Sequence, residues 1–239
     1  MLTIARSELA QIVRNRAVLI TNLLMPAAAA AFFIWSRDTF EQIGSLGYVA
    51  AVLVFTVAAF SLYATVVTTL AARRQTLFLK RLRSTAASDP AILSGLVLPV
   101  AVTAVLQVTV ILVVFAGVSG APAQVALLVA AITAALAMML ALGIATAGVT
   151  RSPEHAQITT LPLSLGVIAV ASWVGITGTG ELGWLKRLLP GGSATELVVD
   201  AWHGGIPLAD SLPLLAPTLG WVVVAVAVAR RMFRWEPRR

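Results

Sequence analysis

The sequence predicts an all-α integral membrane protein with six transmembrane helices, and three observations lead to this fold class. The chain is 59% hydrophobic and only 11% charged, whereas a soluble domain is about half apolar and about a quarter charged. It contains six apolar stretches that are long enough to cross a bilayer, which takes about 20 helical residues. Its lysines and arginines alternate between rich and poor connecting segments. We therefore interpret residues 1–239 as one transmembrane domain surrounded by lipid.

The six predicted spans follow each other with short connections. They cover residues 17–35, 46–72, 91–117, 124–149, 157–177 and 212–229. Ser88-Asp89-Pro90 precedes the third span and Ser152-Pro153-Glu154 precedes the fifth. Each offers a capping hydroxyl with a proline in the first helical turn, which favours a helix start at these points.

The distribution of basic residues predicts the orientation, because cytoplasmic segments of membrane proteins carry the excess of Lys and Arg. The segment before the first span carries three, the second loop five, the fourth loop one and the segment after the last span five. The first, third and fifth loops carry one, none and two. This alternation predicts that both termini and the second loop are cytoplasmic, in a multi-pass protein of a bacterial-type cell membrane.

Residues 1–16 predict a helix that lies along the inner membrane surface. Apolar side chains fall on one helical face and polar ones on the other, a pattern typical of interfacial helices. The candidate contact residues are Leu9, Ile12 and Arg14. The alternatives are a plain extension of the first span and a cleaved signal peptide, which the length of the charged segment disfavours.

The central parts of the predicted spans hold no Asp, Glu, Lys, Arg or His. Their absence disfavours a proton-coupled carrier and acid–base catalysis inside the membrane. Aromatic and hydroxyl groups nevertheless gather in the second span, with one hydroxyl in the fifth. The candidate lining of a path for an amphipathic molecule is Phe55, Thr56, Phe60, Tyr63 and Ser164. The alternative is that these hydroxyls bond only to their own or a neighbouring helix.

Several site types are not expected in this chain. It has no cysteine, which excludes thiolate metal sites and disulfides. Neither lysine follows the Gly-rich turn that a phosphate-binding loop needs. His155 and His203 fall on opposite membrane faces, so they cannot share a metal. We therefore expect no catalytic residues, no cofactor or metal bound by this chain, and no nucleic-acid partner.

Residues 178–211 form a predicted outer loop. Pro190-Gly191-Gly192 breaks the chain within it, and a short helix is expected to follow. Glu196 and Asp200 are four residues apart on that helix, and we interpret them as part of a solvated face.

The second loop, residues 73–88, carries the most distinctive pattern in the chain. Leu77, Phe78, Arg81 and Leu82 lie close to one face of a short predicted helix, with further basic groups around it. Three interpretations of this pattern are open. The helix binds anionic lipid headgroups, its basic residues only set the membrane topology, or it is a docking helix for a cytoplasmic partner.

Within this loop, Leu79-Lys80-Arg81-Leu82-Arg83-Ser84-Thr85 resembles the loop between spans two and three in membrane subunits of ABC transporters of the ABC-2 permease type. The first half of the loop departs from that pattern, with Gln75 where an acid is usual and Leu77 where glycine is usual. The resemblance extends over the whole chain as architecture, including the Leu189-Pro190 segment before a short outer helix.

The resemblance implies a permease subunit of an ATP-driven exporter that moves a drug, antibiotic or lipid outward. A separate cytoplasmic ATPase subunit would bind ATP and Mg, so this chain would not itself be an enzyme. A second permease would pair with it, more readily as a homodimer than as a heterodimer, with spans two and five facing the route. The residues implied to couple to the ATPase are Arg74, Gln75, Phe78, Arg81, Leu82 and Arg83. A secondary carrier, a lipid-modifying enzyme and a scaffold or sensor that recruits a partner remain as alternatives.

Overall fold

The computed structural model describes residues 16–43, 45–84, 88–204, 206–233 and 235, and over these residues it contains helices and no strand. The helices are α2 (Arg16–Trp35), α3 (Arg37–Ile43), α4 (Leu46–Val57), the π-helix η1 (Ala58–Ala64), α5 (Thr65–Gln75), α6 (Phe78–Arg83), α7 (Asp89–Ser119), α8 (Val125–Val149), α9 (Pro153–Thr177), α10 (Gly183–Leu188), α11 (Gly192–His203), α12 (Leu208–Ser211), the 3-10 helix η2 (Leu212–Leu214) and α13 (Leu215–Met232). The all-helical prediction is confirmed.

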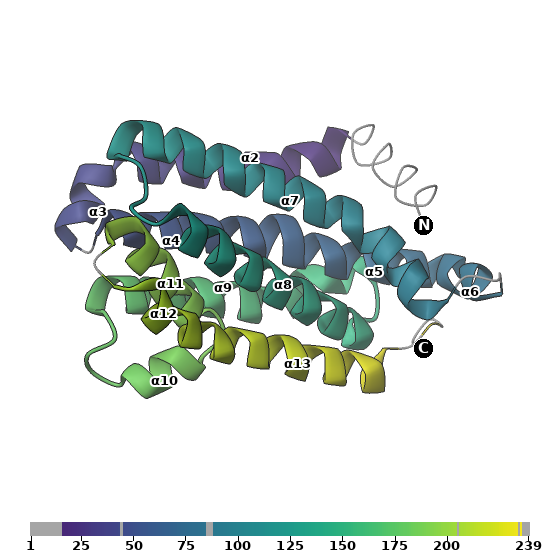
Figure 1. Cartoon of the computed structure of the whole chain (residues 1–239). Helices are drawn as coiled ribbons and strands as arrows, with labels where there is room; N and C mark the ends of the chain where they lie inside the picture. The colour runs from purple at the N-terminus through teal and green to yellow at the C-terminus, as the bar shows by residue number, and fades with distance from the viewer. Residues whose placement is uncertain (1–15, 44, 85–87, 205, 234, 236–239) are drawn as a thin grey trace.

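One continuous rod, formed by α4, η1 and α5, lies at the centre of the bundle. Every residue from Gly47 to Val57 is buried, as expected of a helix that is hydrophobic all round. Helices α2 and α7 pack on one side of the rod, and α8, α9 and α11 pack on the other, with α13 beyond α8 (Figure 1). The rod is therefore the core around which the other long helices are arranged.

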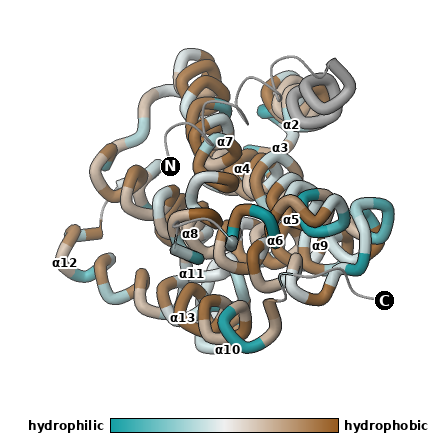
Figure 2. The backbone as a smooth tube through the Cα atoms, turned by 90° about the vertical axis from the view of Figure 1, so that its right-hand side faces the viewer, coloured by the Kyte–Doolittle hydropathy of each residue, from teal (hydrophilic) through white to brown (hydrophobic). Residues whose placement is uncertain are grey.

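The outer helices expose apolar side chains, which identifies their environment. Leu106 and Val113 of α7, Ile158 of α9 and Val223 of α13 are all largely exposed. Figure 2 shows that the long helices are mainly hydrophobic, whereas hydrophilic segments gather near α6 and α10. A surface of this kind faces lipid rather than water, so the protein is a multi-pass membrane protein.

Within the described part of the chain, five helical stretches are long and apolar enough to cross a membrane. They are Leu46–Gln75, Asp89–Ser119, Val125–Val149, Pro153–Thr177 and Leu208–Met232. These correspond to the second to sixth predicted spans. The predicted first span, residues 17–35, coincides with α2, of which Pro26–Trp35 forms a shorter apolar helix. The predicted interfacial helix, residues 1–16, falls almost entirely outside the described part of the chain.

The ends of the bundle are distinct, and we name them by the short helices that they carry. Helix α6 marks one end, where α5, α8 and α13 finish and α7 and α9 begin; α3, α10 and α11 mark the opposite end (Figure 1). Ser152 caps α9 as predicted, because its hydroxyl accepts a hydrogen bond from the His155 amide. Ser88 occupies the corresponding position before α7, but its side chain makes no capping bond.

The π-helical segment η1 was not predicted. It brings the rod against α8, where a Cβ on Gly143 would lie 3.4 Å from the Tyr63 carbonyl oxygen. The Tyr63 and Thr146 hydroxyls are 3.1 Å apart across the same contact. A Cβ on Gly143 would also lie 3.1 Å from Cγ1 of Val66 in α5, so the glycine allows α8 to lie close to the rod.

Candidate functional site

The short helix predicted between the second and third spans is α6, and its start is a sharp turn. Leu77, between α5 and α6, has φ 58° and ψ 12°, in the left-handed region. This conformation costs a non-glycine residue about 1–2 kcal/mol. The glycine that is usual at this position in the loops that the chain resembles would adopt it freely. The leucine at this position therefore carries a steric cost that a glycine would not.

One side of α6 faces the bundle and the other faces outward. Leu79 is completely buried, and Phe78 and Leu82 are half-buried beside it. Lys80 and Arg81 are exposed. Leu79 was not predicted to be the residue that packs α6 against the bundle, although its spacing of three residues from Leu82 places the two on one helical face. The outcome is a small basic surface on a helix fixed by its apolar side.

Arg83 connects α6 to two further elements. Its Nε lies 3.2 Å from an Asp89 carboxylate oxygen at the start of α7. Its guanidinium also lies 5.1 Å from the ring centroid of Trp235, beyond the end of α13, within the range of a cation–π interaction. Trp235 was not predicted as part of this site.

Arg74, one of the predicted coupling residues, does not lie at the surface. Its side chain is 1% exposed, and its guanidinium donates to the Ala147 carbonyl at 2.9 Å and to the Thr150 carbonyl. These carbonyls belong to the last turn of α8, where a helix leaves acceptors unsatisfied and favours a cation. Arg74 therefore joins the end of α5 to the end of α8 and does not reach the surface.

The end of α8 is also joined to α13. A Cβ on Gly148 would lie 3.2 Å from the Met232 carbonyl oxygen and 3.3 Å from the Phe233 Cα, so the two backbones touch at this point. Helix α8 thus contacts both α5 and α13 at the α6 end of the bundle. Of the predicted coupling residues, Gln75, Arg81 and Arg83 are exposed, Phe78 and Leu82 are half-buried, and Arg74 is buried.

The residues predicted to line a substrate path lie inside the protomer. Phe55, Thr56, Tyr63 and Ser164 are buried, and Phe60 is half-buried. The Thr56 hydroxyl donates to the Val52 carbonyl of its own helix at 2.8 Å. Neither of two cavities on the flanks of α7, one beside α2 and one beside α8, is lined by any of these residues. The predicted interfacial residues Leu9, Ile12 and Arg14 lie outside the described part of the chain.

The opposite end of the bundle holds two charged side chains that are largely buried, Lys186 of α10 and Glu196 of α11. Glu196 of α11 accepts two hydrogen bonds from Arg187, at 2.7 and 2.6 Å, and one from the Thr179 hydroxyl at 2.7 Å. Lys186 is buried, and its Nζ donates to the Thr177 hydroxyl and the Gly178 carbonyl at the end of α9. The interpretation of Glu196 as part of a solvated face is wrong.

Asp200, one turn further along α11, is the least satisfied of these groups. Its Oδ2 is buried and has no hydrogen-bond partner among the residues that the structure describes. Burial, reinforced by the nearby Glu196 carboxylate and opposed by Arg187 and His203, raises the pKa of the Asp200 carboxyl to about 6. The solvated-face interpretation is wrong here as well, because α11 packs against α4, α8 and α9.

A family model described as "ABC-2 family transporter protein" matches residues 4–230, which include every helix from α2 to α12 and most of α13. Neither the curated proteins nor the solved structures contain a match.

Proposed function

Because the chain belongs to the ABC-2 family of transporter proteins, we propose that it is the membrane-spanning permease subunit of an ATP-driven exporter. The observation that carries the proposal is the junction at α6. A helix with an exposed basic side is attached to α7 and to the segment after α13 through Arg83, while the neighbouring Arg74 joins α5 to α8. A force applied to α6 would therefore reach four of the long helices.

The proposed partner is a separate ATPase subunit that binds ATP and Mg on the cytoplasmic side. Gln75, Lys80 and Arg81 are exposed at the α6 end and suit an acidic surface on that partner. Arg83 lies beside them, already paired with Asp89. Arg74 takes no direct part in this docking, and its role in the proposal is to pass motion from α5 to α8.

The proposed transport unit contains a second permease, most simply an identical copy. Helix α9 exposes Ile158, Leu161 and Leu165, which gives the copy an apolar surface to contact. The proposed cargo is a hydrophobic or amphipathic compound that moves outward.

The proposed path requires the end of α4 and η1 to separate from their neighbours, because Phe55 and Thr56 of α4 and Tyr63 of η1 are buried. A π-helical turn is a suitable place for such a change, since π-turns are uncommon and occur often at functional sites. Residues of α9 such as Ser164 would then face the same opening.

The proposal is tested by reconstituting the chain with its ATPase in vesicles and measuring ATP hydrolysis and export together. We expect Arg81→Glu to lower export by about tenfold by opposing the acidic surface of the partner, with the permease still folded. Arg230→Glu is the matched control, because Arg230 is an exposed arginine at the same end, on α13. Transport driven by a proton gradient without any ATPase would contradict the proposal.

A further inference from the structure

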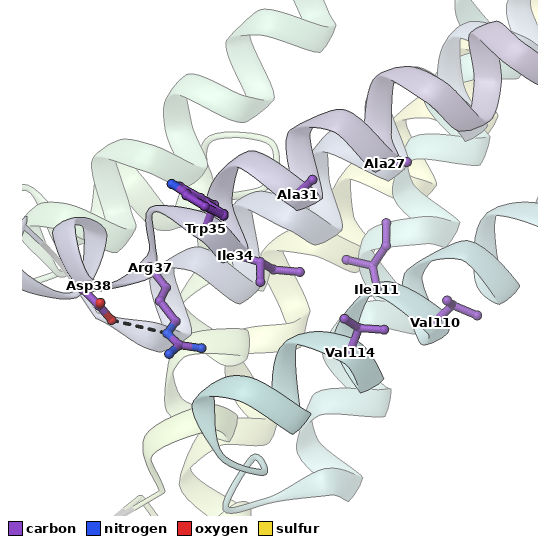
Figure 3. A pocket seen from close by; sticks show the side chains of 9 residues that line it. All are labelled: Ala27, Ala31, Ile34, Trp35, Arg37, Asp38, Val110, Ile111 and Val114. Carbon is purple, nitrogen blue, oxygen red and sulfur yellow. Dashed lines mark hydrogen bonds and ion pairs between the residues drawn. The ribbon is translucent and has the colours of Figure 1, made fainter.

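An open pocket of about 620 Å³ lies between α2 and α7, towards the α3 end of the bundle. Its walls are apolar: Ala27, Ala31 and Ile34 come from α2, and Ile111 and Val114 come from α7. Figure 3 shows Ile34, Ile111 and Val114 pointing into the space between the two helices. None of the residues that line the pocket belongs to α6 or to the predicted substrate path.

The pocket exists because α2 offers little side-chain volume at this point. Five consecutive alanines, Ala27–Ala31, follow Pro26. Small residues commonly let membrane helices approach closely, but here α7 stays apart and the space remains. Water has few polar partners on such walls, so in a bilayer the pocket suits a hydrocarbon chain.

The rim of the pocket is charged, in contrast with its walls. The Arg37 Nε lies 3.3 Å from an Asp38 carboxylate oxygen, and Arg37 Nη1 donates to the Val118 carbonyl at 3.0 Å. A guanidinium has five N–H donors, and these contacts use two of them. The Asp38 side chain is 83% exposed, so most of the carboxylate remains accessible. Both charges therefore face a molecule that enters the pocket from the membrane surface.

Trp35 indicates the depth at which this rim lies in the membrane. Its side chain is 90% exposed, and only Ser36 separates it from the charged pair Arg37 and Asp38. Exposed tryptophans gather at the level of the lipid headgroups. An apolar trough that ends in a cation and an acid at this depth has the same order of groups as a phospholipid.

We propose that the α2–α7 pocket binds a zwitterionic glycerophospholipid. One acyl chain occupies the trough along Ala27 and Ala31, the phosphate accepts hydrogen bonds from Arg37, and the headgroup amine pairs with Asp38. Asp38 is what separates this ligand from an anionic lipid, because an anionic headgroup would place a second negative charge beside the carboxylate.

A helix of a second copy fits the pocket less well than a lipid chain. Such a helix presents no phosphate to the Arg37 guanidinium. It would also leave the exposed Asp38 carboxylate without a matching cation. The binding does not depend on the proposed ATPase partner. The pocket lies towards the end opposite α6, so the proposed topology would place the bound lipid in the non-cytoplasmic leaflet.

The test is native mass spectrometry of the full chain in detergent, titrated with phosphatidylethanolamine and phosphatidylglycerol that carry the same palmitoyl and oleoyl chains. We expect the wild type to retain phosphatidylethanolamine preferentially. Ala31→Phe fills the trough and Arg37→Gln removes the phosphate contact, and each should lower retention of both lipids by about tenfold. Asp38→Asn should abolish the preference between the two lipids, a ratio that does not depend on the yield of folded protein.

Two control variants complete the design. Ala28→Phe adds the same bulk on α2 at an exposed position that does not line the pocket, and Arg230→Gln removes an exposed arginine at the other end of the bundle. Both should retain lipid as the wild type does. Unchanged retention in Ala31→Phe, an unchanged preference in Asp38→Asn, or a monomer–dimer equilibrium that responds to Ala31→Phe while lipid retention does not, would each overturn the proposal. ATP hydrolysis and export are not measured, so failure here leaves the proposed function standing.

Discussion

At the scale of single residues, the left-handed backbone at Leu77 makes a direct prediction. Leu77→Gly removes the steric cost of the left-handed conformation, although it makes the unfolded chain more flexible, so we expect stability to change by less than about 0.5 kcal/mol. Leu77→Val places a β-branched side chain in the same conformation and should destabilise by about 1–2 kcal/mol. Thermal unfolding in detergent measures both changes.

The second left-handed leucine provides an internal repeat of this experiment. Leu182 precedes α10 with φ 53°, and its glycine and valine variants should differ in the same direction. Leu219→Val, at an exposed position within α13, controls for the loss of a methylene group. Equal stability of the glycine and valine variants at both sites would contradict the role of backbone strain.

The raised pKa of the Asp200 carboxyl predicts how the stability of the protein depends on pH. The pKa of the Asp200 carboxyl is about 6 in the folded protein, above its ordinary value of 3.8, so the folded state binds the proton more tightly. The stabilisation from protonation is fully present below about pH 3.8 and is lost as the pH rises through 6. With allowance for solvent screening of a half-exposed group, it amounts to about 1–2 kcal/mol.

Asp200→Asn should remove this pH dependence, because the amide keeps the shape of the side chain and carries no charge. Thermal unfolding in detergent between pH 4 and about 7 measures the effect. Glu181→Gln, an exposed acid at the same end, should leave the slope unchanged. A slope that survives in Asp200→Asn would contradict the assignment of the pH dependence to Asp200.

At the scale of elements, α9 contains a matched pair of glycines. A Cβ on Gly175 would lie 2.3 Å from Cδ2 of the buried Tyr48 ring, whereas a Cβ on Gly166 would meet nothing within 4 Å. Gly175→Ala should therefore destabilise the α4–α9 contact by about 1–3 kcal/mol through overpacking. Gly166→Ala should stabilise α9 by about 0.5–1 kcal/mol. Thermal unfolding of the two variants in one detergent compares them, and a Gly175→Ala variant as stable as the wild type would contradict the packing of α9 on Tyr48.

The long helices could be predicted from the sequence, because apolar length and caps such as Ser152 define them. The π-helix η1 could not, since hydropathy and residue type carry no signal for the shift to a wider turn. Helix α6 was predicted as a short helix, but which of its leucines is buried depends on the bundle beneath it. The burial of Arg74 has the same origin, because an arginine beside a basic loop gives no indication that carbonyls of α8 lie within reach.

At the scale of the whole molecule, which span forms the centre of the bundle could not be predicted from the sequence. Helix α7 is as apolar as the rod of α4, η1 and α5, yet α7 exposes much of its surface and the rod does not. In a membrane, lipid and protein interior are equally apolar, so hydropathy does not distinguish a lipid-facing side from a core-facing one. The path residues Phe55 and Tyr63 were predicted to face an opening and lie in the core for this reason.

The membrane topology of the whole bundle can be tested with single introduced cysteines, because the chain has no cysteine of its own. Ser84 and Glu181 are exposed at opposite ends of the bundle, and the excess of basic residues predicts that the Ser84 end is cytoplasmic. In intact cells, an impermeant maleimide should label Glu181→Cys and leave Ser84→Cys unlabelled until the membrane is permeabilised. Thr3→Cys should behave as Ser84→Cys does if α2 completes a sixth crossing. Ala50→Cys, at a fully buried position, should stay unlabelled in both conditions. Labelling of Ser84→Cys in intact cells would reverse the orientation, and labelling of Thr3→Cys alongside Glu181→Cys would reduce the crossings to five.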